Sequence, residues 1–507
     1  MMQRLSFHPA SGDTRLRPAR RLPIAVAAAV CVAVLAGCVN LAPAYVPPGA
    51  PIPQAWPAGA LTTPGAAGAD AGEPLLTGWQ DFFIDERLRR VVELSLANNR
   101  DLRLAALNID RARAQYGIAQ AAAYPSVDIG ASASRGRSGG NSAAGSRVST
   151  QYSVDIGLLS YEIDFFGRVR NLSEAALQSY FSTEETRRST QISLVAEVAT
   201  AWLSLAADVQ RLQLAQGTLQ SQQKSYELIE RSHALGAQSG IALAQARSTV
   251  EAARVDVALF DSQVEQDRNA LNLLAGTTVP DDLLPPRLDA VAISPAARLL
   301  VPPAGLPSTV LQQRPDVLAA ERALRASNAD IGAARAAFYP RIALTGSAGT
   351  ASSNLSGLFG SGTSVWNFTP SISLPIFDAG ANRANLRVAQ VQQQLQLASY
   401  EKTLQTAFRE VADALAVRRT LAERLSAQQA LVASTGRSFD LSQALFRSGG
   451  SGYLDVLDAQ RSLYGVQQSL ISLQLVEQVN RIAVYRALGG GWSSTTVAAP
   501  EPVAPGQ

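Results

Sequence analysis

The chain consists of two related copies, and this internal repeat constrains its fold more than any other feature. At an offset of 215 residues, Tyr124-Pro125 matches Tyr339-Pro340, and the surrounding window aligns without a gap. Further along, the offset becomes 213, where Gly236 matches Gly449. Self-similarity of this kind predicts that one supersecondary unit is built twice and packed against itself.

Composition divides the chain further. Residues 278–305 are rich in proline and predict a linker between the copies. The predicted domains are a lipoprotein signal peptide (1–37), a lipid anchor with a Pro-rich tether (38–78), the first repeat (79–277), the inter-repeat linker (278–305), the second repeat (306–489) and a flexible C-terminal tail (490–507).

Each copy has the same internal order. A helix ends at Tyr-Pro, where proline stops it. Apolar residues then alternate with small or polar ones, which predicts β-hairpins at about 126–166 and 341–377. Heptads such as Val195, Trp202 and Val209 follow, and they predict coiled-coil helices at about 168–277 and 381–488. The predicted fold class is therefore α+β, mostly α, and internally duplicated.

The hairpins favour a membrane barrel over a soluble sheet. Their alternation extends over the length of a transmembrane strand, and the helices are occupied in coiled coils. No apolar stretch long enough for a spanning helix is expected after Cys38. Four strands do not close a barrel, and an open edge is not tolerated in lipid. Several protomers are therefore expected to pool their hairpins into a barrel that continues as a helical tube.

The N-terminus predicts secretion. Arginines precede the apolar stretch from Ile24 to Leu35, which is too short to span a bilayer. The stretch ends in Leu35-Ala36-Gly37-Cys38, which resembles the lipobox of bacterial lipoproteins. This resemblance implies that Cys38 is acylated, for example with palmitate, and becomes the first residue. Val39 follows in place of the aspartate of inner-membrane retention, which favours the outer membrane.

Composition excludes several classes of function. The formal net charge is +3, of which residues 1–37 contribute +4, so the remainder carries no basic surface for nucleic acid. The two cysteines, Cys31 and Cys38, leave no disulfide after the leader is removed. The two histidines are His8 and His233, too few for a histidine metal site or a catalytic triad. We expect no enzyme, no metal and no cofactor, and a solvated His233.

At this point the chain resembles the TolC-type outer-membrane channel family, and within it the OprM-like (NodT-type) lipoprotein outer-membrane factors. The resemblance covers nearly all of residues 38–492. Its motifs are Pro43-Ala44-Tyr45 after the lipobox, Trp79-Gln80-Asp81-Phe82-Phe83, Ala97-Asn98-Asn99-Arg100-Asp101-Leu102, Tyr161-Glu162-Ile163-Asp164-Phe165-Phe166-Gly167-Arg168-Val169-Arg170, Gln313-Arg314-Pro315-Asp316, Tyr453-Leu454-Asp455-Val456-Leu457-Asp458-Ala459-Gln460-Arg461 and Ala487-Leu488-Gly489-Gly490-Gly491-Trp492.

The resemblance implies a homotrimer with a twelve-stranded outer-membrane β-barrel, four strands from each protomer. An α-helical barrel with an equatorial domain would continue it into the periplasm. The implied partners are a periplasmic membrane-fusion adaptor, an inner-membrane RND-type transporter and outer-membrane lipid. The implied location is the bacterial outer membrane, with a lipid anchor.

The resemblance also implies a periplasmic gate. Leu454 and Asp458 match the constriction rings of the family, and Arg447 matches an arginine that locks the closed tip. Phe446 stands where close relatives have tyrosine, so a hydroxyl-mediated latch is lost there. Leu454 and Asp458 are four residues apart and therefore share one helical face. The expected adaptor-contact tips are the helix turns containing Gly236, Gln238, Gly240, Gly449 and Gly452.

Three functions remain open from the sequence. The first is the passive exit duct of a tripartite efflux pump for small molecules such as drugs. The second is the outer-membrane duct of a type I protein-secretion system, which shares the fold. The third is a structural coiled-coil lipoprotein without a pore. The lipobox and the tail Gly489-Gly490-Gly491-Trp492 favour the first.

Overall fold

The structure, a computed structural model, describes residues 39–56, 78–138, 147–287, 296–298 and 307–491. The signal peptide, Cys38 and the tail after residue 491 lie outside these residues. The chain divides into a strand unit (1–43, 120–172 and 330–386) and a helical unit (44–119, 173–329 and 387–507). The units do not coincide with the repeats, because each combines equivalent segments of both copies.

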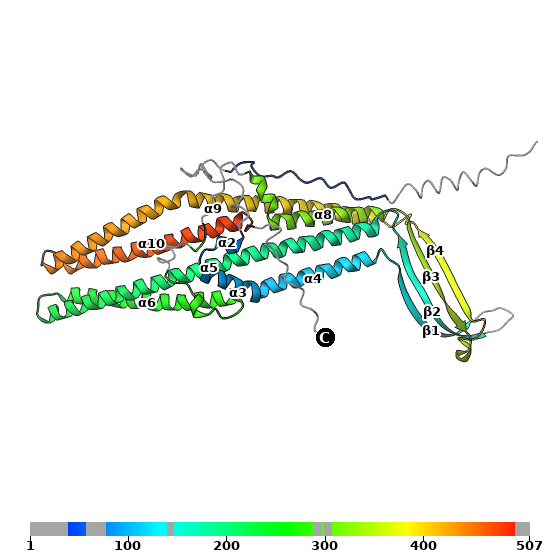
Figure 1. Ribbon diagram of the computed structural model, residues 1–507, viewed down its shortest axis with the longest axis horizontal. Helices are drawn as coiled ribbons and strands as arrows, with labels where there is room; N and C mark the ends of the chain where they lie inside the picture. The colour runs from blue at the N-terminus through cyan, green and yellow to red at the C-terminus, as the bar shows by residue number, and fades with distance from the viewer. Residues whose placement is uncertain (1–38, 57–77, 139–146, 288–295, 299–306, 492–507) are drawn as a thin grey trace, which may run out of the picture. The chain divides into compact units, whose positions relative to one another are not determined.

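The strand unit contains one antiparallel sheet in the order β1-β2-β3-β4 (Figure 1). Its strands are β1 (Ser126–Ser138), β2 (Arg147–Ile163), β3 (Arg341–Ser352) and β4 (Ser364–Ser373). The first copy supplies β1 and β2, the second supplies β3 and β4, and β2 pairs with β3 across the repeat. The outer edges of β1 and β4 have no partner strand in the described part of the chain.

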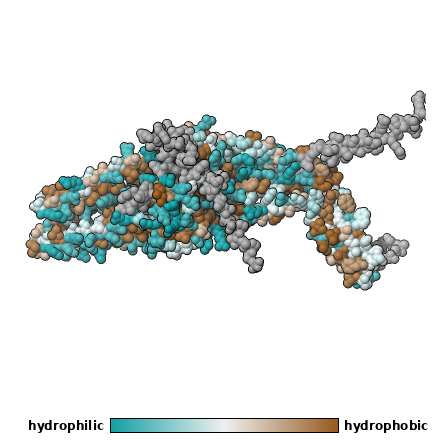
Figure 2. Space-filling model, in the orientation of Figure 1, coloured by the Kyte–Doolittle hydropathy of each residue, from teal (hydrophilic) through white to brown (hydrophobic). Residues whose placement is uncertain are grey.

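The two faces of this sheet differ in polarity. Directly opposed residues share a face, and the pairs Ile129↔Ile156 and Ala348↔Trp366 place apolar side chains on the same side. This apolar face is open: Trp366 is 80% exposed and Ile129 is 77% exposed. Apolar surface is visible along the strands in Figure 2. The opposite face carries small and polar residues, including Asp128, Ser132, Asp155, Ser347, Asn367 and Thr369.

Four helices dominate the rest of the chain. They are α5 (Arg168–Ala234) and α6 (Gly240–Ala275) from the first copy, with α9 (Ala381–Arg447) and α10 (Tyr453–Ala487) from the second. At ~1.5 Å per residue, the 67 residues of α9 extend roughly 100 Å. The shorter elements are α2 (Trp79–Phe82), α3 (Glu86–Asn98), α4 (Arg100–Ala121), α8 (Pro315–Ala336), η2 (Asp281–Leu283), η3 (Ser308–Gln313) and η4 (Leu355–Gly357).

The main core of the helical unit lies where the heptads predict it. Val198, Trp202 and Leu205 of α5 are fully buried or nearly so. The Trp202 Nε1 donates to the Leu283 carbonyl oxygen at 3.0 Å, which satisfies its polar atom inside the core. Phe82 stacks on Tyr485, with ring centroids 4.1 Å apart. The core therefore joins residues from both repeats.

One described helix, α5, contains an 18-residue stretch that is long and apolar enough to cross a membrane. The expectation that no such stretch follows Cys38 is therefore wrong by length and composition. In the structure 61% of that stretch is buried. The same helix supplies Val198, Trp202 and Leu205 to the core, so α5 is a core helix of the helical unit.

Part of the predicted tether is packed against the protein. Trp56 is buried and stacks on Phe408, with ring centroids 4.9 Å apart. The Ser308 Oγ donates to the Pro53 carbonyl oxygen at 2.6 Å. The Tyr45 hydroxyl donates to Glu321 at 3.2 Å. Residues 44–56 therefore lie on the helical unit, although they form no helix or strand.

Candidate functional site: the helix turns and the base of the sheet

The first helix turn joins α5 to α6. The Ala237 amide donates to the Ser232 carbonyl oxygen at 2.9 Å, and the Gly236 amide donates to that of His233 at 2.9 Å. Gly236 has a φ of 76°, a left-handed conformation in which glycine meets no Cβ penalty. Ser239 then caps α6 by accepting from the Ala242 amide at 3.1 Å. The turn is closed by local hydrogen bonds.

His233 belongs to the same turn. Its Nδ1 lies 2.8 Å from the carbonyl oxygen of Gln238, to which it donates. The residue is exposed, as the sequence predicts, but its ring bridges the turn rather than facing only solvent. The geometry of His233 therefore supports a role in closing the turn by a hydrogen bond.

The second helix turn joins α9 to α10 with the same backbone pattern. The Gly450 amide donates to the Leu445 carbonyl oxygen at 2.8 Å, and the Gly449 amide donates to that of Phe446 at 3.0 Å. Gly449 has a φ of 78°. Gly452 precedes α10 and provides no side-chain cap. The two copies therefore reverse direction by the same glycine-dependent geometry.

A small apolar cluster ties the turns together. Ile229 of α5, Ala246 of α6 and Tyr453, Val456 and Leu457 of α10 are buried in it. Phe446 of α9 packs against this cluster, and its ring lies 5.5 Å from that of Tyr453. The cluster holds all four helix ends to each other within one protomer.

Of the predicted gate residues, Phe446 packs against this cluster, whereas Leu454, Asp458 and Arg447 do not belong to it. Leu454 is 52% exposed. The Asp458 side chain is 61% exposed, and its nearest cationic partner is Arg461 at 3.5 Å. Arg447 Nη2 donates to Gln443 Oε1 of its own helix at 2.8 Å. Within one protomer, Leu454 and Asp458 are therefore free to face another molecule, whereas Phe446 serves mainly as packing.

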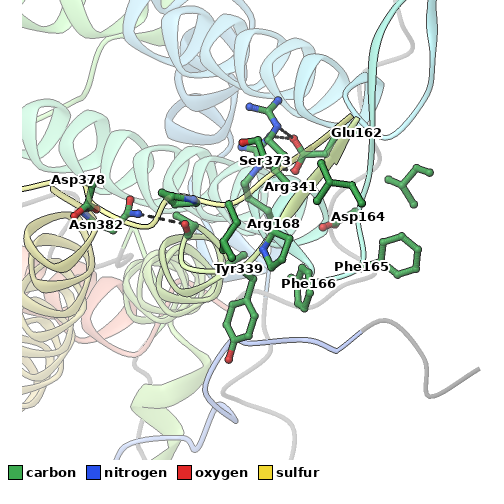
Figure 3. Close-up of a pocket in the computed structure, with 17 residues that line it drawn as sticks. Glu162, Asp164, Phe165, Phe166, Arg168, Tyr339, Arg341, Ser373, Asp378 and Asn382 are labelled. Atoms are coloured by element: carbon green, nitrogen blue, oxygen red, sulfur yellow. Dashed lines mark hydrogen bonds and ion pairs between the residues drawn. The ribbon is translucent and has the colours of Figure 1, made fainter. Parts of the chain in front are cut away.

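A second candidate region, separate from the helix turns, lies at the base of the sheet around a cavity of about 700 Å³ (Figure 3). Glu162, near the end of β2, has a side chain only 9% exposed. Arg168 binds both of its oxygens at 2.8 Å, and Arg341 of β3 forms a second ion pair with it. A buried carboxylate with two guanidinium partners avoids the cost of an unpaired charge.

Neighbouring contacts stiffen the same region. Asp378 accepts from the amides of Gly380 at 2.9 Å and Asn382 at 2.8 Å, which lowers its pKa through these hydrogen bonds. Phe166 stacks on Tyr339, with ring centroids 4.7 Å apart. Glu162 and Arg168 come from the first copy, whereas Arg341 and Tyr339 come from the second. The cluster thus joins the repeats where β2 pairs with β3.

This ion cluster was not predicted from the sequence. Glu162 and Arg168 belong to the family motif Tyr161–Arg170, but the motif by itself predicts no contact between them. The available signal was position: Arg341 directly follows Tyr339-Pro340, and Glu162 lies near the end of its predicted hairpin. Only the pairing of β2 with β3 places the two side by side.

None of these groups is arranged for metal binding or covalent chemistry. Among the described residues, no cluster of three or more His, Cys, Asp or Glu side chains is placed to hold a metal ion. The polar groups at the helix turns are mainly capping and turn-closing groups. The arrangement is suited to holding helices and strands in place.

Comparison with known proteins gives a consistent result. A family model described as outer membrane efflux protein matches residues 91–277 and 306–490. The chain is 45% identical over 472 residues to a probable efflux pump outer membrane protein, TtgC, of Pseudomonas putida. That alignment covers 92% of this chain and 96% of the relative. The chain is also 42% identical over 485 residues to the cation efflux system protein CusC of Escherichia coli. This second alignment covers 94% of the chain and 100% of CusC.

A solved structure agrees with these relatives. A membrane protein from Pseudomonas aeruginosa superposes with a TM-score of 0.81 at 41% identity, covering 89% of this chain and 98% of that chain. The predicted fold class, mostly helical with four antiparallel strands, is confirmed. Because the family match covers both repeats and these relatives align along almost their whole length, the chain belongs to the outer membrane efflux protein family: it is an outer-membrane channel of an efflux pump and not an enzyme.

Proposed function

We propose that three copies of this chain form a lipid-anchored exit duct for small molecules, which receives its cargo from a periplasmic adaptor and an inner-membrane RND-type transporter. The observation that carries the proposal is the open sheet. Its apolar face is exposed, and the outer edges of β1 and β4 have no partner in the described chain. A sheet edge in lipid must be paired. Pairing β4 of one copy with β1 of the next supplies that partner.

Three copies give twelve strands, which exceeds the minimum for a closed barrel. In this arrangement the apolar face meets lipid and the polar face lines the passage. Asp128 and Asp155 lie on the polar face of the described strands, so each copy contributes at least these two carboxylates to the proposed passage. Rings of carboxylates favour cations over anions. The remaining small side chains leave a wide and permissive lumen.

Relatives support small molecules as the cargo class. The similar proteins are named for efflux of antibiotics, toluene and cations. These cargoes share little chemistry, which fits a duct that does not select strongly. The sequence also left open a protein-secretion duct. The names of these relatives refer to efflux and not to protein secretion.

The proposed gate lies on α10. Under threefold symmetry Leu454 and Asp458 each form a ring of three, and their exposure leaves them available to line a constriction. Arg447 is proposed to lock the closed tip, and Phe446 packs behind it without a hydroxyl. The two turns, with Gly236, Gln238, Gly240, Gly449 and Gly452, are the proposed adaptor contacts.

The proposed anchor is an acyl group on Cys38, which lies outside the described residues. Its support is the lipobox sequence together with the position of the following residue. The Val39 amide donates to the Phe165 carbonyl oxygen at 3.1 Å, at the base of the sheet. Each buried methylene of an acyl chain contributes ~0.8 kcal/mol to membrane binding.

Dye efflux from a deletion strain tests the duct. Cells are loaded with a fluorescent dye while de-energised and are then re-energised. We expect slow efflux in the deletion strain, rescue by the intact gene and poor rescue by Cys38→Ala. Normal efflux in the deletion strain, together with a protein missing from the culture supernatant, would favour the secretion duct.

A further inference from the structure

Two carboxyl groups meet between α5 and α6, away from the helix turns. Asp208 of α5 is only 6% exposed, and Asp267 of α6 lies beside it at hydrogen-bonding range. Both adjoin the main core, against which Val209 and Val264 pack. Neither residue belongs to the proposed gate, the turns or the ion cluster at the base of the sheet.

Hydrogen-bond donors are unevenly distributed around this pair. Arg211 forms an ion pair with Asp208, and its other terminal nitrogen donates to Ser472 Oγ of α10 at 3.0 Å. Gln263 donates to Asp267 Oδ1 at 3.2 Å. Asp267 Oδ2 is buried and has no protein donor among the described residues. Two carboxylates are both acceptors, so their contact requires a proton between them.

We propose that a proton shared by Asp208 and Asp267 forms a clasp that holds α6 on α5 in acid and releases it at neutral pH. When the proton is present, Asp267 is neutral, and the negative charge of Asp208 is balanced by the positive charge of Arg211. Without the proton, a second negative charge is left beside Asp208 with a single guanidinium to neutralise both. The clasp extends to α10, because the same Arg211 also binds Ser472.

The titration of Asp267 is consistent with this geometry. Burial, together with the hydrogen bond and the charge of Asp208, raises the pKa of Asp267 to about 6. Gln263 and Arg211 act in the opposite direction. The other nearby cation of α6, Arg268, is engaged by Asp281 and Glu265. On α10, the polar contact is the neutral Ser472.

The sign of the effect follows from linkage. The folded chain holds this proton up to about pH 6, whereas an unfolded aspartate loses it near its ordinary pKa of 3.8. The folded state therefore binds more protons between these values, and its stability falls as pH rises through that window. A difference of about two pKa units is a ~100-fold difference in proton affinity.

Thermal unfolding of the purified full-length protein at pH 4.5 and pH 7.5 tests the clasp. We expect Asp267→Asn to lose a large part of the wild-type difference in unfolding temperature between the two pH values, because asparagine donates to Asp208 at either pH. Asp261→Asn is the matched control on the exposed face of the same helix, and it should keep the wild-type difference. Other carboxyl groups contribute equally to the wild type and to both variants.

A pH difference for Asp267→Asn equal to that of the wild type would overturn the clasp. Asp208→Asn provides a second test if Asp267→Asn fails to fold. Removal of the neighbouring carboxylate should return the pKa of Asp267 toward its ordinary value, so the pH window should shift downward; an unshifted window would also overturn the clasp. The unfolding experiment does not depend on the proposed duct, so the two proposals can fail separately.

Discussion

The two helix turns have nearly the same backbone and different side chains. Gly236 and Gly449 have φ values of 76° and 78°, and each turn is closed by the same pair of backbone hydrogen bonds. At the matched positions that follow, the first copy has Gly240, Ala242 and Gln245. The second copy has Tyr453, Asp455 and Asp458.

This difference separates what builds the turn from what acts there. The shared glycines supply the left-handed residue that a tight helix reversal requires. The residues unique to the second copy supply a buried aromatic ring and two carboxylates. The backbone of the turn is thus common to both copies, whereas Asp458, a proposed gate residue, is present only in the second. If this division is correct, substitutions at matched positions of the two copies should differ in their effects, whereas substitutions of the shared glycines should not.

The largest effect is expected for Tyr453→Ala. Removing a buried aromatic ring from the apolar cluster should cost about 3–5 kcal/mol, so protease cleavage at the turns of the intact protein should increase sharply. The matched change Gly240→Ala should cost little, because an added Cβ would meet only His233 Cε1 at 4.0 Å. Equal protease sensitivity of the two variants would remove the difference between the copies.

The turn glycines should be equally sensitive to substitution. Gly236→Val and Gly449→Val each force a β-branched residue into the left-handed region, at a cost of about 1–3 kcal/mol. Denaturant unfolding monitored at each turn should show similar losses. If only one of the two variants loses stability, the left-handed glycine is required at one turn and not at both.

The proposed gate should respond to Asp458→Ala. Replacing three carboxylates in a constriction should raise single-channel conductance in a planar bilayer by a factor of about two to five, which corresponds to ~0.4–1 kcal/mol, the size of a charge interaction in water. Selectivity for cations should fall in the same recording. Unchanged conductance and selectivity would contradict the gate assignment of Asp458.

The smallest effect is expected for Gln245→Asp, the reverse change in the first copy. It adds a carboxylate at the position that matches Asp458, but outside the proposed constriction. Conductance should stay within about 1.5-fold of the wild type, less than ~0.3 kcal/mol. A change as large as that of Asp458→Ala would indicate that both copies line the narrowest point.

The local patterns proved the most predictable part of the fold. The Pro-free segment from Ala381 to Arg447 is a single helix, and the alternating segments form four antiparallel strands. The heptad positions Val198, Trp202 and Leu205 are buried. These features depend on residues that are close in sequence, and the spacing of the apolar ones predicts which face of a helix or strand packs against a neighbour. The gate residues came from the family resemblance, and they stay a prediction.

Contacts between distant residues were not predictable in this way. The sequence does not state that residues 44–56 pack on the helical unit, or that Arg341 joins Arg168 at Glu162. It also does not state that Asp208 and Asp267, 59 positions apart, share one polar site. Single charges and short proline-rich segments carry no periodicity, so their partners are set by packing.

The order of the amino acids is enough to predict the duplication, the strand and helix periodicities, the glycine turns and the apolar face of the sheet. Each follows from local spacing and from the free energy of burying one face. The three-dimensional fold was needed to show which strands pair across the repeat, how both copies are divided between two units, and which buried charges meet. Those choices depend on long-range packing and on desolvation, which are properties of neighbours in space rather than in sequence.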